Sequence, residues 1–332
     1  MRKGTQCWVT GGTGFIGRHL VRTLLRAGAR VHLLCRDARK ARELFADAVT
    51  ITRGDLREPV VIRDAEWVFH VGARYAFGRR YRREMEEVNV AATVRLLDAA
   101  RRARVERFLF VSSASVLANR RAPITERDFP NHVPVAQAYR RSKWLAERAC
   151  QEFAARGLPV VIANPTSPLG PEDEAPTPTG RMMVDFLQRR FPAAAHTRLN
   201  FVNVRELAEG LVAAAERGRV GERYLLAHHD VWLLDFLRLL GTITGRPAPR
   251  WTVPWPVLAV GGLIGEWTNS NRLCRETAWH CLKHQPFDAR KAAAELGWQP
   301  RIPLEQSARA AVAWFQNPRI PEPHFVEADA TA

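Results

Sequence analysis

The chain passes from an apolar run into a helical pattern through Val9-Thr10-Gly11-Gly12-Thr13-Gly14-Phe15-Ile16-Gly17. This pattern predicts a strand that turns sharply into a helix whose unpaired N–H groups face a pyrophosphate. A Cβ at a glycine position would block the turn, the approach of the ligand or the contact between helix and sheet. The stretch therefore indicates a dinucleotide site. The residues that we expect to touch the cofactor here are Thr10, Gly11, Gly14, Phe15, Ile16 and Gly17.

Short apolar runs rich in β-branched residues recur downstream of this turn, at 6–9, 30–35, 48–52, 67–71, 107–112 and 159–163. Helical patterns separate them, for example at 19–27, 88–103 and 142–156. Such alternation is typical of a parallel sheet covered by helices on both faces. The predicted fold class is α/β, a Rossmann-like doubly wound parallel sheet with a smaller, interleaved C-terminal substrate domain.

Prolines mark a second, irregular region, because Pro165 to Pro168 and Pro171 to Pro178 hold too many of them for a helix or a central strand. Residues 199–227 resume a strand–helix–strand pattern, which we interpret as a return to the first sheet. The predicted dinucleotide-binding domain is therefore 1–170, with 199–230 returning to it. The predicted substrate-binding part comprises 171–198 and 231–332.

Composition is that of a globular enzyme, with 332 residues of which 46% are hydrophobic. The five cysteines are scattered without metal-ligand spacing, so we expect reduced thiols, a cytoplasmic location and no bound metal. The N-terminus runs directly into the glycine turn, which argues against an export signal. The sequence leaves open a homodimer.

The net charge of +16 comes from 50 basic and 34 acidic residues. Only five of the basic residues are lysines, and the arginines are spread along the whole chain, which indicates a compositional habit and not a patch. The densest cluster, Arg74 to Arg83, alternates arginines with aromatic residues, as a single-strand nucleic-acid binder would. We favour a solvated or substrate-facing loop and expect no nucleic-acid partner.

The most apolar stretch is Trp251 to Ile264, which is too short to span a bilayer. We favour a role in the core or in a pocket lining. A mouth for a lipophilic substrate, or contact with a membrane surface, stays open, because Trp251, Trp255 and Trp267 would suit either.

Tyr139 and Lys143 are four residues apart at the start of a helical pattern, so both side chains project from one face. An ammonium beside a phenol stabilises the phenolate and so lowers the pKa of the phenol. A lysine can reach ribose hydroxyls and the phenol together, whereas a planar guanidinium could not. Ser113 follows the strand expected at 107–112, at the edge where such sheets bind ligands. We expect its hydroxyl to orient a substrate carbonyl.

These motifs together resemble the extended short-chain dehydrogenase/reductase family. Further matches are Gly54-Asp55-Leu56, Phe69-His70-Val71-Gly72-Ala73 and Asn89 within Val88-Asn89-Val90. Within the family the chain is most similar to dihydroflavonol-reductase-like proteins and to hopanoid-associated sugar epimerases, notably over 163–171, 176–181 and 200–208. The resemblance covers residues 5 to about 316.

The resemblance implies roles for several residues outside the glycine turn. Asp55, with Leu56 beside it, would hold the adenine amino group, and Gly72 and Ala73 would line the cofactor channel. Asn89 would support the catalytic helix, and Pro165 would begin the backbone that passes the nicotinamide. Family dehydratases carry an acidic pair after the catalytic serine or threonine, whereas Ala114 and Ser115 stand here. A sugar dehydratase is therefore disfavoured, and Leu117 at a common tyrosine position weakens a nucleotide-sugar reading.

The end of the second strand bears on the cofactor. Cys35 takes the usual place of a carboxylate that binds the ribose diol, and Arg36 and Lys40 follow. This favours a 2′-phosphate and hence NADP(H) over NAD(H), although Asp37 competes with that interpretation.

We therefore expect an NADP(H)-dependent oxidoreductase that acts on a ketone or secondary alcohol, on a substrate that the tryptophan-rich stretch suggests to be lipophilic. An epimerase with the same three residues is the nearest alternative. A non-catalytic NADP sensor or RNA-binding scaffold is a third, which the intact Ser113, Tyr139 and Lys143 argue against.

Overall fold

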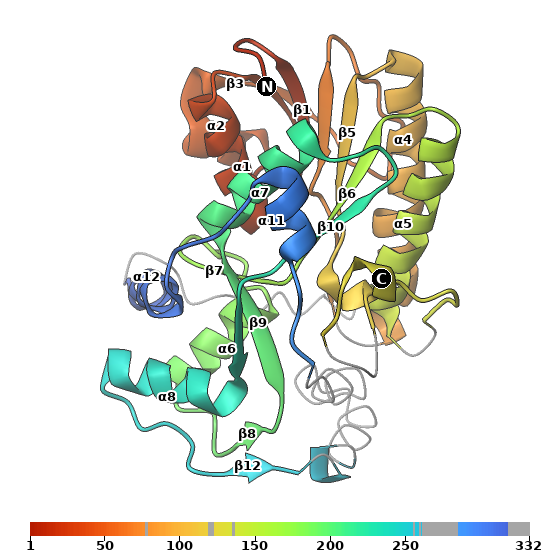
Figure 1. The fold of residues 1–332 in the computed structure, drawn as a ribbon. Coiled ribbons are helices and arrows are strands. Elements are labelled where there is room, and N and C mark those ends of the chain that lie inside the picture. Colours follow the sequence, from red (N-terminus) through yellow and green to blue (C-terminus); the bar gives the residue numbers. More distant parts are fainter. Residues whose placement is uncertain are drawn as a thin grey trace.

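A parallel sheet forms the centre of the protein. The structure is a computed structural model that describes residues 1–76, 79–118, 123–134, 137–254, 256–258, 260 and 285–317. Within these residues the central sheet has seven strands in the order β10-β6-β5-β4-β1-β2-β3, all parallel (Figure 1). The expected doubly wound sheet is confirmed. Its strands are β1 (Gln6–Thr10), β2 (Arg30–Cys35), β3 (Val49–Arg53), β4 (Trp67–His70), β5 (Arg107–Val111), β6 (Val160–Pro165) and β10 (Arg223–Leu226).

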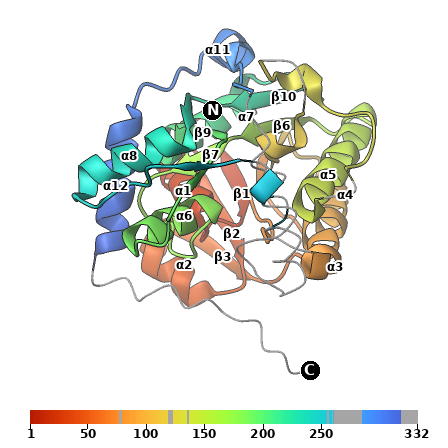
Figure 2. The same ribbon diagram turned by 90° about the horizontal axis from the view of Figure 1, so that it is seen from below.

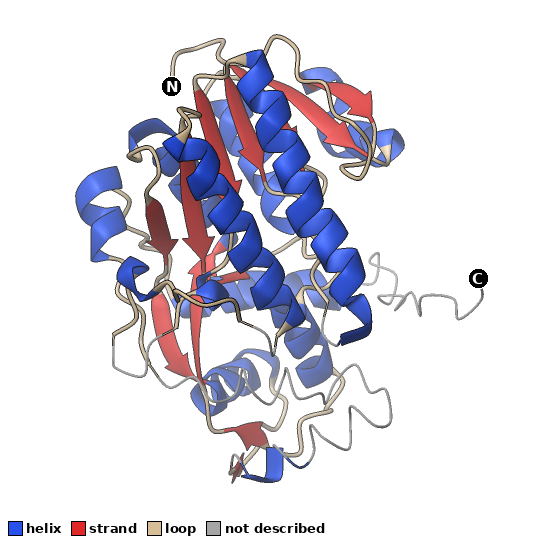
Figure 3. Cartoon of the chain, turned by 90° about the vertical axis from the view of Figure 1, so that its right-hand side faces the viewer, coloured by secondary structure: helices blue, strands red, loops and turns tan. Residues whose placement is uncertain are grey.

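Helices cover both faces of this sheet because alternate strand residues point to opposite sides. Cys7 and Val9 of β1 pack into one core, whereas Trp8 packs into the other. Figure 3 shows long helices across the face that lies on the right in Figure 1. Helices on the first side are α1 (Phe15–Arg26), α2 (Ala38–Phe45), α7 (Val204–Arg217) and α11 (Arg290–Leu296). Those on the second are α4 (Ala92–Ala103) and α5 (Ala138–Ala155).

A second, smaller core lies beyond the carboxyl edge of the sheet, around Phe201 and Phe236. Its sheet has the order β11-β9-β7, and a further pair joins β8 to β12. Seen from below, α6, α8 and α12 lie across the molecule from α4 and α5 (Figure 2). The elements of this part are β7 (Ser167–Leu169), α6 (Pro178–Leu187), β8 (Ala194–Ala195), β9 (Arg198–Asn203), β11 (His229–Trp232), α8 (Leu233–Thr244), β12 (Thr252–Val253) and α12 (Leu304–Gln316).

The expected return of residues 199–227 to the central sheet is right for α7 and β10 and wrong for β9. β9 runs antiparallel to β11 and parallel to β7, so it belongs to the second sheet. The prolines also proved compatible with regular structure. Pro165 is the last residue of β6, and Pro178 opens α6, where its missing N–H costs no hydrogen bond. The division into two domains stays a prediction.

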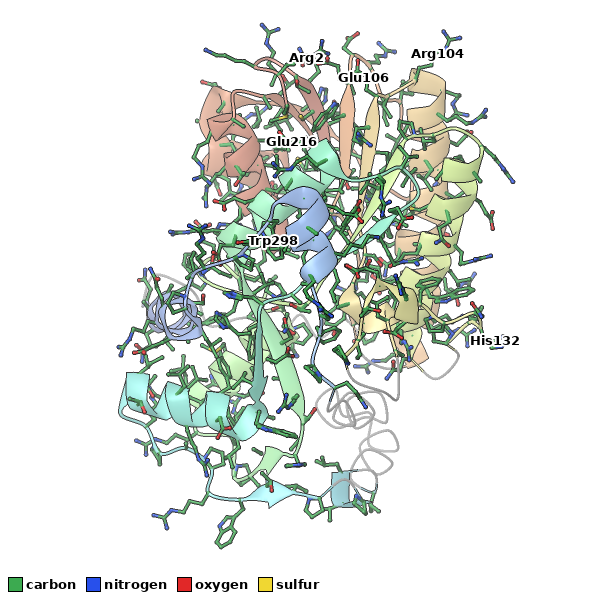
Figure 4. The ribbon with its side chains drawn as sticks, viewed as in Figure 1. Arg2, Arg104, Glu106, His132, Glu216 and Trp298 are labelled. Atoms are coloured by element: carbon green, nitrogen blue, oxygen red, sulfur yellow. The ribbon has the colours of Figure 1, made fainter. Side chains whose placement is uncertain are left out.

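The N-terminus of the chain lies at the amino edge of the sheet, opposite the carboxyl edge where the site is expected. Figure 4 shows Arg2 and Glu106 together at this edge, with Glu216 below them. The guanidinium of Arg2 lies 3.0 Å from Glu66 and 3.7 Å from Glu106. The N-terminal amino group lies 2.5 Å from Glu216 of α7. These ion pairs leave the carboxyl edge free of the terminus.

The turn between β1 and α1 depends on two close backbone contacts. Gly11 has φ +70, and a Cβ there would lie 2.5 Å from the backbone nitrogen of Gly72. A Cβ on Gly17 would overlap the carbonyl oxygen of Gly11. At Gly14 the nearest atom to an added Cβ is that same oxygen, at 3.3 Å.

We predict that Gly17→Ala lowers the free energy of unfolding by about 2 kcal/mol, because overpacking here must displace backbone. Gly14→Ala is the matched control and should change it much less. Urea unfolding of the two variants and the wild type measures the difference. Equal stability of Gly17→Ala and wild type would contradict the close contact.

Candidate active site

Ser113 stands directly after β5, at the carboxyl edge of the sheet. Its Oγ accepts the N–H of Ser115 at 3.1 Å, which caps the short helical turn Ala114–Val116. The same hydroxyl is hydrogen-bonded to the phenol of Tyr139. The structure thus brings together two residues that lie 26 positions apart in the sequence.

Tyr139 lies in the first turn of α5, and the ring of Tyr75 packs edge-on against it at a centroid distance of 4.0 Å. Burial raises the pKa of the Tyr139 phenol, while the hydrogen bond with Ser113 lowers it. The net shift is upward, opposite to the lowering expected from Lys143. The phenol therefore keeps its proton at neutral pH, as a proton donor must. The sequence did not identify Tyr75, although it belongs to the arginine-rich loop noted above.

Lys143 follows one helical turn later and is only 3% exposed. Its Nζ donates to the carbonyl oxygen of Val111 at 2.8 Å and lies 5.0 Å from the centre of the Phe110 ring. Burial lowers the pKa of Lys143 from 10.5 to about 8, and the charge of Glu147 partly opposes this. Lys143 therefore stays mostly cationic at neutral pH, on the same helix face as Tyr139.

Glu147 extends this face by one more turn and is completely buried. Its carboxylate accepts hydrogen bonds from Asn164 of β6 at 2.5 Å and from Arg223 of β10 at 3.3 Å. Asn164 also donates to the carbonyl oxygen of Ser113 at 3.2 Å. Burial raises the pKa of Glu147. The Glu147 side chain therefore joins α5, which carries Lys143, to β6 and β10. Asn164 of β6 also holds the carbonyl of Ser113.

A buried polar chain begins at Thr10, the last residue of β1. The Thr10 hydroxyl accepts the N–H of Gly72 at 3.2 Å and lies 2.7 Å from Nδ1 of His70. Nε2 of His70 lies 2.9 Å from the hydroxyl of Thr93, which donates to the carbonyl of Asn89 at 2.7 Å. Burial lowers the pKa of His70 to about 3, so the ring is neutral. A neutral ring can accept from Thr10 and donate to Thr93, which satisfies every member.

Asn89 ends this chain and contacts α5. It lies in a π-helical turn, Glu86–Ala91, between the short helix α3 (Arg82–Met85) and α4. Its amide donates to Ser142 of α5 at 2.9 Å and to the carbonyl of Arg74 at 2.8 Å. Its oxygen accepts the N–H of Arg74 at 2.7 Å. These contacts fit the supporting role that the resemblance implied.

The residues around the glycine turn fit a dinucleotide. Among the described residues no side chain caps the N-terminus of α1, and its first turn carries no acidic residue. The backbone N–H groups of Phe15, Ile16 and Gly17 are thus left for an anion. Beside the turn, Gly72 follows β4, and a Cβ on it would lie 3.0 Å from Leu56. Ala73 is exposed next to it, and Pro165 is buried at the end of β6.

The end of β2 and the loop after β3 carry the residues expected at the adenosine. Arg36 is exposed, and its charge lowers the pKa of Asp55 together with Arg57, whose guanidinium binds both oxygens of Asp55. The carboxylate of Asp37 accepts the N–H of Lys40 at 3.0 Å and so caps α2. The Nζ of Lys40 lies 2.8 Å from Glu174, a partner that the sequence did not indicate.

The apolar C-terminal stretch is described only in part. Trp251 is 74% exposed, so packing in the core is wrong for this residue. Trp255 and Trp267 lie outside the described residues, as do 259 and 261–264. Among the described residues, no three His, Cys, Asp or Glu side chains gather as a metal site would require. In the same part of the chain no helix is long and apolar enough to cross a membrane.

The buried Lys143 makes stability depend on pH. Its folded-state pKa lies below the usual 10.5, so the unfolded chain binds this proton more tightly from pH 8 to 10.5, and stability rises with pH across that window. Wild type should gain about 2 kcal/mol of unfolding free energy between pH 8 and 10 relative to Lys143→Met. Urea unfolding at both pH values measures this, with Lys3→Met on the surface as control. Equal gains in wild type and Lys143→Met would refute the buried ammonium.

Known proteins share both sequence and fold with this chain. The NAD dependent epimerase/dehydratase family matches residues 7–227. A Synechocystis sp. protein named as a candidate dihydroflavonol 4-reductase is 34% identical over 325 residues, which cover 93% of this chain and 94% of that protein. Sterol demethylase protein B of Methylococcus capsulatus is 32% identical, over 93% of this chain and 98% of that protein.

A solved structure agrees with these relatives. The crystal structure of a nucleoside-diphosphate-sugar epimerase from Pseudomonas aeruginosa is 26% identical and superposes with a TM-score of 0.79, covering 94% of this chain and 97% of that one. The glycine turn, Ser113, Tyr139 and Lys143 all lie within the matched family region. The chain therefore belongs to the NAD-dependent epimerase/dehydratase family and is an NAD(P)-dependent enzyme of the extended short-chain dehydrogenase/reductase type.

Proposed function

We propose that the protein is an NADP(H)-dependent oxidoreductase that interconverts a ketone and a secondary alcohol on a lipophilic substrate. The observation that carries this proposal is the hydrogen bond between the Ser113 hydroxyl and the Tyr139 phenol at the carboxyl edge of the sheet. Lys143 lies one helical turn from Tyr139 on the same face. This arrangement offers a proton and a hydrogen-bond donor to one substrate oxygen.

Ser113 orients the substrate carbonyl by donating a hydrogen bond to its oxygen. Tyr139, whose pKa burial raises, holds its proton until the carbonyl oxygen gains charge and then transfers it there. The bound nicotinamide supplies the hydride that the carbonyl carbon accepts. Proton and hydride together turn the ketone into a secondary alcohol, and the reverse path oxidises the alcohol. The cation of Lys143 stabilises the phenolate and holds the ribose hydroxyls.

Arg36 and Lys40 support the preference for NADP(H). Arg36 directly follows β2 and Lys40 lies in the first turn of α2. Cys35 stands where a carboxylate would bind a ribose diol. The competing carboxylate, Asp37, is engaged in capping α2. Asp55, Leu56, Gly72, Ala73 and Pro165 complete the cofactor site in this proposal, with Asn89 as support for α5.

Two features support a lipophilic substrate. Tyr75 places an aromatic ring against Tyr139, and Trp251 exposes an apolar side chain. The name of the Methylococcus relative also refers to a sterol. The free, buried thiols of Cys7, Cys35 and Cys150 support a cytoplasmic location.

An epimerase is the second candidate, which the Pseudomonas aeruginosa structure favours. It would use the same three residues but return its nucleotide to the starting redox state. A sugar dehydratase is disfavoured because Ala114 and Ser115 offer no acidic pair after Ser113.

We predict net oxidation of NADPH with a lipophilic ketone and no turnover of common nucleotide sugars. The assay follows the nicotinamide absorbance across a panel of ketones, alcohols and nucleotide sugars, with product stereochemistry recorded. Inversion of a sugar stereocentre without a net change in free nicotinamide would overturn the proposal in favour of an epimerase.

Tyr139→Phe is the mechanistic control in this assay. It should lower kcat more than tenfold and leave NADPH affinity nearly unchanged, because the ring still packs but carries no proton. Tyr224→Phe is its match, since that buried hydroxyl binds Glu295 away from the site. Tyr139→Phe with more than a tenth of wild-type kcat would remove Tyr139 as the proton donor.

A further inference from the structure

The segment between β7 and α6 lays three consecutive acidic residues beside α1. Glu172 is paired with Arg22 and lies 3.4 Å from His19. Asp173 turns inward instead. Its carboxylate accepts hydrogen bonds from the backbone N–H of Thr177 at 3.0 Å and from the Thr177 hydroxyl at 2.6 Å. Glu172 thus fastens the segment to α1 before Glu174, and the bonds between Asp173 and Thr177 span Glu174.

Glu174 binds two cations from different elements. Its Oε2 lies 2.7 Å from the guanidinium of Arg18 and 2.8 Å from the Nζ of Lys40. Arg18 is 3% exposed and Lys40 is about one-third exposed, whereas Glu174 is about half exposed. The carboxylate thus bridges a buried guanidinium and a partly exposed ammonium.

The position of this ion pair relative to the glycine turn makes it relevant to the cofactor. Arg18 follows Gly17 directly, and the same guanidinium donates to the carbonyl of Thr13 within the turn at 3.1 Å. Lys40 lies in the first turn of α2, four residues after Arg36. Glu174 therefore lies where the glycine turn meets the end of β2, which is the place that the proposed function gives to the 2′-phosphate.

We propose that Glu174 competes with the 2′-phosphate of the cofactor for Lys40 and thereby limits the preference for NADP(H) over NAD(H). This inference rests on the proposed function. A carboxylate and a phosphate cannot share one ammonium without repulsion, so Glu174 must move aside when the phosphate binds. The pair of Glu174 with Lys40 is partly exposed, and such pairs contribute little to stability, so Lys40 can exchange the carboxylate for the phosphate. This competition weakens binding only of the nucleotide that carries the 2′-phosphate.

Glu174→Gln tests this because it removes the charge and keeps the shape. The probes are 2′,5′-ADP and 5′-AMP, which differ only by the 2′-phosphate, with binding measured by titration calorimetry at low salt. We expect Glu174→Gln to bind 2′,5′-ADP roughly 3- to 10-fold more tightly than wild type and to bind 5′-AMP about as tightly as wild type does. Glu172→Gln is the matched control, because it makes the same charge change but its partners are His19 and Arg22.

The proposal would be overturned if Glu174→Gln left the affinity for 2′,5′-ADP unchanged, or if it raised the affinity for both nucleotides alike. An equal effect of Glu172→Gln would also overturn it, because the change would then be a general one of charge. In a Lys40→Gln background the gain should fall by at least half, and an undiminished gain would show that Lys40 is not the shared group.

Wild type separately tests the cofactor preference. If wild type binds 2′,5′-ADP no better than 5′-AMP while Glu174→Gln acquires the preference, the role of Glu174 holds and the preference proposed for wild type fails. If neither protein distinguishes the two nucleotides, both fail.

Discussion

The site depends on a buried chain of hydrogen bonds that joins the glycine turn to α5. It runs from Thr10 through His70 and Thr93 to Asn89, and from there to Ser142. Each group has one arrangement that satisfies its neighbours, and a charged His70 would break it. Since burial lowers the pKa of His70 to about 3, the chain holds over the whole physiological range. The turn that would bind the pyrophosphate therefore keeps a fixed position relative to Tyr139 and Lys143.

Asn89 fixes the start of α5 through Ser142, and Glu147 fixes the helix further along. Its bonds to Asn164 and Arg223 tie the helix to β6 and β10. The helix that carries the phenol and the ammonium is thus held at two points, Ser142 and Glu147. A polar network inside the core is costly unless it is satisfied, so a network at this place is best explained by the positions that it imposes.

Much of the fold could be predicted from the sequence because the strands of a doubly wound sheet are short apolar runs between helical patterns. Strand pairing could not be predicted in the same way. β9 reads like a central strand, but its partners are β7 and β11 of the second sheet. The π-helical turn around Asn89 also carries no periodic signal. It follows from tertiary contacts with Arg74 and Ser142.

The placement of the candidate site residues at the carboxyl edge of the sheet could be predicted best, while their roles stay predictions. Ser113, Tyr139 and Lys143 have residue types and spacing that belong to one reaction, and the structure brings the first two into contact. Tyr75 and Glu174 were not predicted, because each acts from a loop whose path is set by the tertiary fold. The predicted direction of the Tyr139 pKa shift was wrong for a related reason. Burial raises this pKa and outweighs the lowering expected from the charge of Lys143.

A crystal structure of the protein with NADP⁺ bound tests the account most directly. We predict the pyrophosphate on the N–H groups at the start of α1, the 2′-phosphate against Arg36 and Lys40, and the ribose hydroxyls at Lys143. A nucleotide bound elsewhere, or bound here with Lys143 still directed only at the carbonyl of Val111, would contradict it.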